Sequence, residues 1–135
     1  MQDIRHHRRR PTLRKRLHGI IADMIGESRL RTTIRLAGPV SVLAPPLSED
    51  VEAVLREAVS NAVRHASATT VSVHLRVHDD VTIEVTDDGI GVPHDFSRLS
   101  GLANLATRAE QAGGSFNVTK GQHGGTMLQW SAPLP

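Results

Sequence analysis

The sequence contains no cysteine and almost no aromatic residues. Of its 135 residues none is cysteine or tyrosine, and the aromatic ones are Phe96, Phe116 and Trp130. Without cysteine the chain has no disulfide, no thiol nucleophile and no cysteine-type zinc site, which is compatible with the reducing cytoplasm where we expect it to act. The scarcity of aromatic side chains leaves no stacking platform for single-stranded nucleic acid.

Long apolar runs are also missing. No segment approaches the roughly 20 apolar residues that cross a bilayer, and the polar, basic first residues lack the apolar stretch of a secretory signal. We therefore expect no membrane contact from this part of the protein. A single domain of this length buries roughly 68% of the surface that its unfolded chain exposes, so a genuine hydrophobic core is expected.

The basic pI of about 9.9 comes from one end of the chain. Residues 1–16 hold seven Lys/Arg and one acidic residue, whereas the remainder holds 9 Lys/Arg and 13 Asp/Glu, a net charge of −4. We expect residues 1–11 to form a disordered basic arm on a mildly acidic domain that spans residues 12–135. A solvated arm explains this charge without a nucleic-acid partner.

Hydrophobic periodicity predicts an alternation of helices and paired strands. The helices are expected over 12–26, 49–66 and 101–112, and the strands over 29–36, 40–43, 69–77, 81–87, 115–119 and 126–132. Thr12 and Ser48 are candidate N-caps, and Gly26 is a candidate stop. Short connections between neighbouring strands favour antiparallel pairing over βαβ crossovers. The predicted class is α+β, a mixed, mostly antiparallel sheet with three helices on one face.

A polar stripe marks the second helix. Glu57, Asn61 and His65 follow one another at intervals of four residues, and each such step turns only about 40° around a helix axis. The other faces of this helix are apolar, so the stripe faces either solvent or a ligand. An isolated stripe of this kind is most often an ordinary exposed face.

A glycine motif follows the strand 81–87. Asp87, Gly89 and Gly91 form the pattern Asp-x-Gly-x-Gly. A carboxylate at a strand end can accept a hydrogen bond from an exocyclic amine such as adenine N6, and the glycines let the backbone approach a planar ring. A calcium loop of the EF-hand type is excluded because no bidentate Glu lies at its twelfth position.

Two further glycine segments complete the pattern. One is Gly124-Gly125-Thr126 before the last strand, and the other begins at Gly101-Leu102 and ends at Gly113-Gly114. With these four segments in order, residues 49–132 resemble the catalytic ATP-binding domain of sensor histidine kinases in the GHKL superfamily. The resemblance is strongest to the NarX/DegS-like subgroup, and within it to mycobacterial dormancy sensor kinases of the DosS and DosT type. It rests on Arg56-Glu57-Ala58, Asn61, Arg64-His65-Ala66 and Arg108-Ala109-Glu110.

The resemblance implies the Bergerat α/β sandwich and an adenine pocket at the end of the strand. Asp87 would bind adenine N6, with Gly89 and Gly91 shaping the pocket. Thr126 would lie beside Asp87 and help to hold it.

The resemblance also implies a phosphate side that uses Mg²⁺. Asn61 would coordinate the Mg²⁺ that bridges the phosphates, and Glu57 would act as the base or as an outer-shell ligand. Arg64 and His65 would line this side, and the helix that begins at Gly101-Leu102 would face the phosphates. The implied activity is transfer of the γ-phosphoryl group of ATP to a histidine on a separate dimerisation domain, and the implied further partner is a cognate response regulator.

Two features depart from the usual pattern of the family. Nine residues, 92–100, separate Gly91 from Gly101, so we expect a very short ATP lid and weak ATP binding by this chain alone. Neither His78, at a strand turn, nor His94, in a loop, lies on a long helix. The phosphoacceptor is therefore expected on another part of a larger kinase, and this chain is not expected to be active in isolation.

Two alternatives remain open at the level of sequence. An anti-sigma-factor-type serine kinase is a GHKL protein of similar length with a protein serine as acceptor. A degenerate module that binds partners and no nucleotide is also compatible with the short lid.

Overall fold

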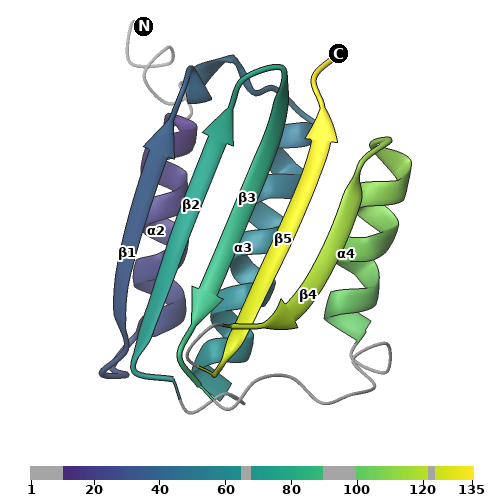
Figure 1. Ribbon diagram of the computed structural model, residues 1–135. Coiled ribbons are helices and arrows are strands. Elements are labelled where there is room, and N and C mark those ends of the chain that lie inside the picture. The colour runs from purple at the N-terminus through teal and green to yellow at the C-terminus, as the bar shows by residue number, and fades with distance from the viewer. Residues whose placement is uncertain (1–10, 65–67, 90–99, 122–123) are drawn as a thin grey trace, which may run out of the picture.

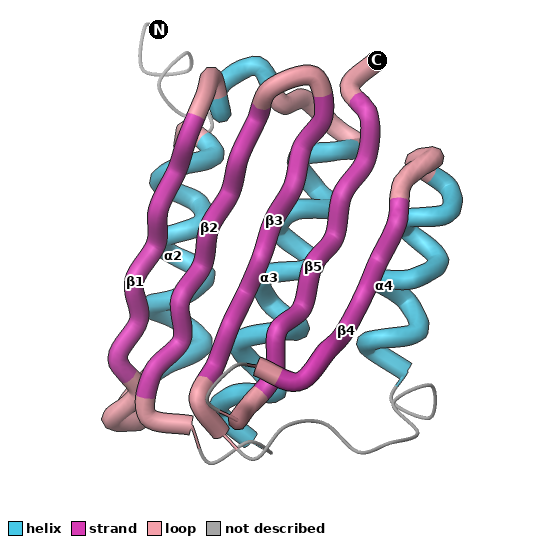
Figure 2. Tube along the Cα trace, in the orientation of Figure 1, coloured by secondary structure: helices cyan, strands magenta, loops and turns pink. Residues whose placement is uncertain are grey.

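The computed structural model describes residues 11–64, 68–89, 100–121 and 124–135, which form one sheet with helices on one of its faces (Figures 1 and 2). In chain order the elements are α2 (Leu13–Ile25), β1 (Arg31–Ala37), the short 3₁₀ turn η1 (Val40–Val42), α3 (Leu47–Arg64), β2 (Thr70–Val77), β3 (Asp80–Asp87), α4 (Ser100–Gln111), β4 (Ser115–Lys120) and β5 (Thr126–Pro133). The predicted class, a mixed α+β sheet with three helices on one face, is confirmed. No helix among the described residues is long and apolar enough to cross a membrane.

The sheet has the strand order β1-β2-β3-β5-β4. The pairs β2–β3, β3–β5 and β4–β5 are antiparallel, and β1–β2 is parallel. The expectation of antiparallel pairing without crossovers is therefore wrong for β1, because the chain passes through η1 and α3 before it returns beside β1 as β2.

The predicted strand 40–43 is wrong, since this segment forms η1. Its N–H groups make local turn bonds, from Val42 to the Pro39 carbonyl at 3.0 Å and from Leu43 to the Val40 carbonyl at 3.1 Å. Val40 and Leu43 are buried. The apolar residues that suggested a strand are thus core contacts of a turn.

The start of α3 also differs from the prediction. The helix begins at Leu47, and Ser48 lies inside its first turn with 2% of its surface exposed. The Ser48 N–H already donates to the Ala44 carbonyl at 3.1 Å, and the Asp50 N–H donates to the Pro46 carbonyl at 2.9 Å. Ser48 is therefore not the N-cap. For α2, by contrast, the N-cap Thr12 and the stop at Gly26 are confirmed, since Thr12 accepts from the Lys15 N–H at 3.2 Å.

The core lies between the sheet and the helices. Alternate residues of the central strands are buried against α3, and α2 packs on α3 from the β1 side. The fully buried side chains include Leu17 of α2, Leu55 of α3 and Trp130 of β5. The Trp130 indole Nε1–H donates to the Leu105 carbonyl of α4 at 3.1 Å, so the third helix is bound to the sheet as well.

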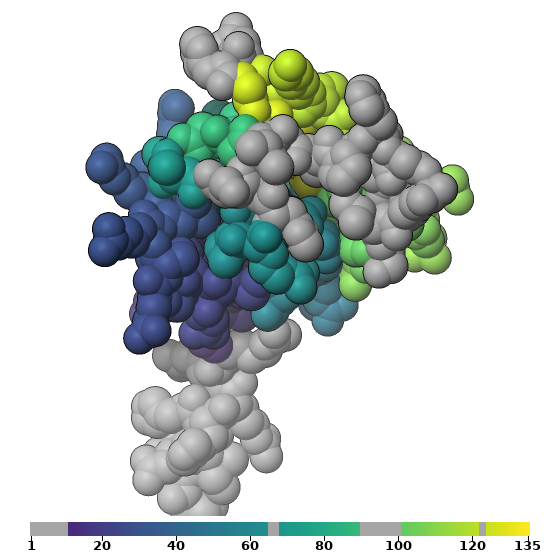
Figure 3. Space-filling model, turned by 90° about the horizontal axis from the view of Figure 1, so that it is seen from below, coloured from purple at the N-terminus to yellow at the C-terminus, as the bar shows by residue number. Residues whose placement is uncertain are grey.

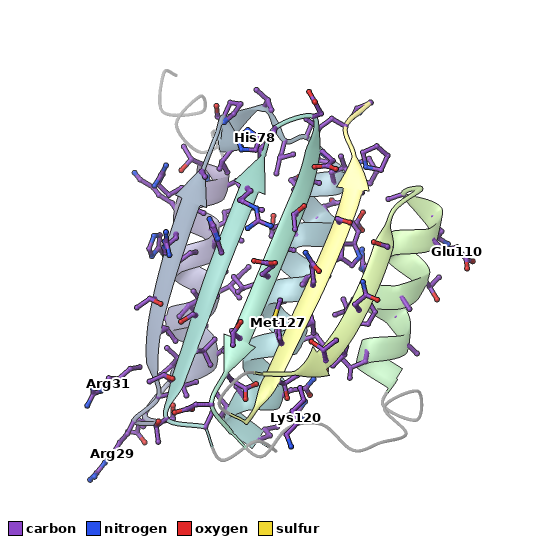
Figure 4. The ribbon with its side chains drawn as sticks, viewed as in Figure 1. Arg29, Arg31, His78, Glu110, Lys120 and Met127 are labelled. Atoms are coloured by element: carbon purple, nitrogen blue, oxygen red, sulfur yellow. The ribbon has the colours of Figure 1, made fainter. Side chains whose placement is uncertain are left out.

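In the described part of the chain no helix covers the opposite face of the sheet, which is mainly polar. Figure 4 shows Met127 on this face and Arg31 at the β1 edge. Glu84 accepts from Arg76 at 3.3 Å and from the side-chain amide of Gln129 at 3.1 Å across neighbouring strands. Such side chains are stable in water, so burial is confined to the helical side of the sheet.

Candidate functional site

Three elements converge at the lower end of the molecule in Figure 1. Strand β3 ends there at Asp87, β5 begins beside it at Thr126, and α3 brings its C-terminal half to the same end. Helix α4 starts at this end too, and Figure 3 views the molecule from this side. The predicted polar stripe and two glycine segments therefore meet in space.

Asp87 is a carboxylate buried at the end of an apolar strand. It is 9% exposed, and its Oδ1 accepts the Gly89 N–H at 2.9 Å. Burial raises the pKa of Asp87, while the backbone N–H groups of Gly89 and Thr126 act in the opposite direction; the charge of Asp88 raises it further. An ionised carboxylate offers about four acceptor sites, so Asp87 can accept a further hydrogen bond from a ligand.

Thr126 pairs with Asp87 across the β3–β5 ladder. Its hydroxyl Oγ1 is buried and has no hydrogen-bond partner among the described residues. Gly125, at φ 74°, lies so close behind Asp87 that a Cβ there would overlap the Asp87 carbonyl oxygen. Buried polar atoms are nearly always satisfied in folded proteins, so the Thr126 hydroxyl fits a site completed by a ligand or by water.

A narrow cleft opens between these groups and the helices. Four of its lining residues are apolar and three are polar: Ala58, Val85, Leu102 and Leu128, with Asn61, Asp87 and Thr126. Apolar walls with a few convergent polar groups are typical of small-molecule sites. This combination can direct the amine of a ligand at the carboxylate.

Glu57 lies one helical turn before Asn61, against the start of α4. A Cβ on Gly101 would overlap the Glu57 carboxyl group, so the carboxyl group packs directly on the glycine backbone. A side chain at position 101 would push the end of the Glu57 side chain aside. The contact also brings a carboxylate to the end of α4 where the helix dipole is positive.

The predicted site residues fall into three groups. Asn61, Asp87, Leu102 and Thr126 line the cleft, while Gly89 and the Glu57–Gly101 pair flank it. Arg64 is exposed at the end of α3, and no contact in the described part of the chain places it in the cleft. His65 and Gly91 lie outside the described residues, as does most of the segment 92–100.

Asp88 has a structural task. Its Oδ1 accepts the Thr69 and Thr70 N–H groups at 2.7 Å and 2.9 Å, and its Oδ2 accepts the Thr69 hydroxyl. These hydrogen bonds hold the pKa of Asp88 well below its usual range, and the Thr69 hydroxyl is the largest cause. Asp88 thus fixes the start of β2, whereas Asp87 faces the cleft.

Sequence reasoning missed the apolar walls of the cleft. Ala58, Val85 and Leu128 follow the ordinary periodicity of a buried helix and two buried strands. Nothing in that pattern distinguishes a wall from the core. Gly125 carried a signal, because it belongs to the glycine segment that precedes Thr126.

A Mg²⁺ ion would find one side-chain oxygen of the predicted kind here, the amide of Asn61. The described residues contain no group of three His, Cys, Asp or Glu side chains that could hold a metal. Mg²⁺ commonly binds through one or two protein oxygens and completes its shell with phosphates and water. The donor set therefore fits a metal that arrives with a nucleotide and not a resident metal.

Comparison with known families decides the class of this site. Residues 47–135 match the family model of histidine kinase-, DNA gyrase B- and HSP90-like ATPases. The chain belongs to this ATPase family. Both the end of β3 and the cleft lie within the matched region, and ATP is the substrate of this ATPase family.

Individual relatives agree with this assignment. The chain is 32% identical over 120 residues to the sensor histidine kinase YxjM of Bacillus subtilis, covering 87% of this chain and 29% of that protein. It is 26% identical over 119 residues to the sensor protein VraS of Staphylococcus epidermidis, covering 84% and 34%. The chain thus spans about a third or less of these curated relatives.

A solved structure resembles the whole fold. The ATP-binding domain of PrrB from Mycobacterium tuberculosis superposes with a TM-score of 0.68 at 26% identity, and the match covers 91% of this chain and 92% of that one. The predicted GHKL fold is therefore confirmed, as is its kinship with sensor histidine kinases.

The two neighbouring aspartates should affect stability in opposite directions. For Asp87→Asn we expect a higher free energy of unfolding near pH 7, because an ionised carboxylate with a raised pKa opposes folding. The gain over the wild type should grow as pH rises above about 4, where the unfolded chain ionises first. Urea titrations between about pH 3 and 7 measure it.

Asp88→Asn is the matched control. Its loss of stability should be full at neutral pH and should begin to shrink as pH falls below about 4, because the pKa of Asp88 is lowered in the folded state. If Asp87→Asn destabilised the protein more than Asp88→Asn at pH 7, the roles given to the two carboxylates would be reversed.

Proposed function

We propose that this chain is the ATP-binding catalytic domain of a sensor histidine kinase. It would donate the γ-phosphoryl group of ATP to a histidine on its own dimerisation and phosphoacceptor domain, from which a cognate response regulator receives it. The observation that carries the proposal is the buried Asp87, which lines a mostly apolar cleft beside Thr126, whose hydroxyl has no partner among the described residues.

Adenine recognition follows from the floor of the cleft. The Asp87 carboxylate accepts the exocyclic N6–H of adenine in a charge-assisted hydrogen bond. The Thr126 hydroxyl is within the same lining and can hydrogen-bond to the ring or to a bridging water. Gly89 and Gly125 keep the backbone behind Asp87 free of side chains, while Leu102 and Ala58 supply the apolar walls.

The phosphates extend from the adenine toward α3 and α4. Mg²⁺, when bound, neutralises charge on the β- and γ-phosphates and orients them for an in-line attack. The Asn61 amide oxygen is the protein ligand assigned to it. Glu57 lies one turn away, where a carboxylate can accept a proton or orient a water in the metal shell. Arg64, exposed at the helix end, is assigned to the phosphate side, as is His65. Gly91 is assigned, with Gly89, to shaping the adenine pocket; both His65 and Gly91 lie outside the described residues.

Residues 12–135 are proposed to act as one domain, although the family match begins only at residue 47. Helix α2 supports this, because its Leu17 is fully buried and its Arg16 pairs with Glu52 of α3 at 3.1 Å. The finer resemblance to dormancy sensor kinases remains a prediction. The serine-kinase alternative is not favoured, because the relatives named above are sensor histidine kinases and sensor proteins.

Asn61→Ala should remove the Mg²⁺-dependent part of ATP binding. Loss of the Asn61 oxygen as a ligand of Mg²⁺ should weaken Mg·ATP binding by about tenfold or more. The affinity for ATP measured in EDTA, without free Mg²⁺, should change little. Isothermal titration of ATP with and without Mg²⁺ gives both numbers. Ser60→Ala, one residue away on the same helix, is the control and should behave as the wild type. Equal Mg·ATP affinity in Asn61→Ala and the wild type would rule out the metal-ligand role.

The proposed activity is tested by phosphoryl transfer in trans. The chain alone should not label itself with γ-³²P-ATP, whereas a form extended at its N-terminus through the dimerisation helices should be labelled on a histidine. Among the described histidines only His18 lies on a helix, where it is exposed, so His18→Gln is the control for stray labelling. Histidine labelling of the short chain, or no labelling of the extended form, would contradict the proposal.

A further inference from the structure

Helices α3 and α4 run antiparallel and are in contact (Figure 1), and two of their contacts involve charged side chains of α3. Near the start of α3, the Asp50 carboxylate accepts from the Arg108 guanidinium with an Nη1–Oδ1 distance of 2.8 Å. Near the cleft, the Glu57 carboxyl group packs on the backbone of Gly101. One contact is an ion pair outside the cleft, and the other belongs to the site.

The two contacts share one register. Asp50 and Glu57 are seven residues apart on α3, and Gly101 and Arg108 are seven residues apart on α4. Seven residues advance about 10.5 Å along a helix and return to within about 20° of the same face. Both contacts therefore lie on one seam and require the same alignment of the two helices.

The ion pair is built to hold its geometry. Asp50 is 6% exposed, in the first turn of α3, where the helix dipole favours a carboxylate. The Arg108 side chain is 35% exposed, and its Nε is buried. Removing the arginine would leave Asp50 buried without its partner, which is far more costly than losing an exposed ion pair.

Other contacts hold α4 to strand β5 of the sheet. Trp130 bonds to the Leu105 carbonyl, and the helix ends in a Schellman motif in which the Gly114 N–H donates to the Ala109 carbonyl at 2.8 Å. A Cβ on Gly114 would overlap the Ser131 carbonyl, so this end lies tightly against β5. Among the described residues, Asp50–Arg108 is the salt bridge that joins α4 to α3.

We propose that Asp50 and Arg108 are positioning residues for the nucleotide site. The pair sets the register of α4 along α3 so that Gly101, which lacks a Cβ, lies opposite Glu57, and Leu102 closes the cleft. A slip of one turn would bring Asn104 or Leu105 against Glu57 and withdraw Leu102. Neither Asp50 nor Arg108 lines the cleft. Fixing a register is the best-attested use of a buried ion pair. The proposal rests on the proposed function of the cleft.

The test compares an arginine of α4 with an arginine of α2, the two helices that pack on α3, in the full 135-residue chain. Arg108→Met breaks the pair with α4, and Arg108→Lys keeps the charge and one donor to Asp50. Arg16→Met is the matched control, because the part-buried Arg16–Glu52 pair joins α3 to α2, on the side away from α4. Three quantities are measured for each: Mg·ATP affinity, hydrogen exchange of the α4 amides, and urea stability.

Arg108→Met should bind Mg·ATP about tenfold more weakly or worse, and its α4 amides should exchange faster. Emission of Trp130, the sole tryptophan of the chain, should shift as its contact with α4 changes. Arg108→Lys should stay within about threefold of the wild type, and Arg16→Met within about twofold even where it loses as much stability.

Two results would overturn the proposal. The first is that the wild type binds Mg·ATP and the Arg108→Met variant binds it with equal affinity. The second applies if the wild type fails to bind nucleotide, a result that counts against the proposed function itself. Hydrogen exchange of the α4 amides then tests whether the pair sets the register. Unchanged protection of α4 in Arg108→Met would in that case refute the positioning role, and faster exchange confined to α4 would support it.

Discussion

The rest of the site depends on the burial of one carboxylate at the end of a β-strand. Burial raises the pKa of Asp87, and the backbone N–H groups of Gly89 and Thr126 offset part of that effect. Glycine at positions 89 and 125 brings that backbone close. A buried carboxylate that lowers the stability of the fold is typical of a ligand site. The neighbouring Thr126 hydroxyl, buried without a described partner, points to the same ligand.

The central helix joins the core to the chemistry. One face of α3 packs on the sheet through residues such as Val54 and Leu55, and the stripe that carries Glu57 and Asn61 turns toward the cleft and α4. A displacement of α3 or α4 would therefore alter both packing and site. This explains why contacts outside the cleft matter for it: the Arg108 ion pair and the Trp130 bond determine where the start of α4 lies relative to α3 and β5.

Much of the fold and part of the site could be predicted from the sequence. Period-2 and period-3.6 patterns identify the central strands and all three helices, since burial of one face is a local property. The segment at Val40 shows the limit of this reasoning, because apolar residues in a buried turn alternate as they do in a strand. Contacts between residues far apart in the sequence could not be predicted. Asp50 and Arg108 are 58 residues apart, and no local pattern marks such a pair. Thr126 beside Asp87 was reached through the family resemblance, not through any pattern in the strands.

The most direct test of the account is the affinity of Mg·ATP for Asp87→Asn and for Asp88→Asn, measured side by side by titration calorimetry. The two residues are adjacent, and each substitution keeps the shape of the side chain, yet only Asp87 faces the cleft. The account predicts that Asp87→Asn loses about 10- to 150-fold in affinity, the usual effect of removing a buried charged acceptor, while Asp88→Asn stays within about threefold of the wild type where both are folded. An equal loss in the two variants, or a larger loss in Asp88→Asn, would contradict it.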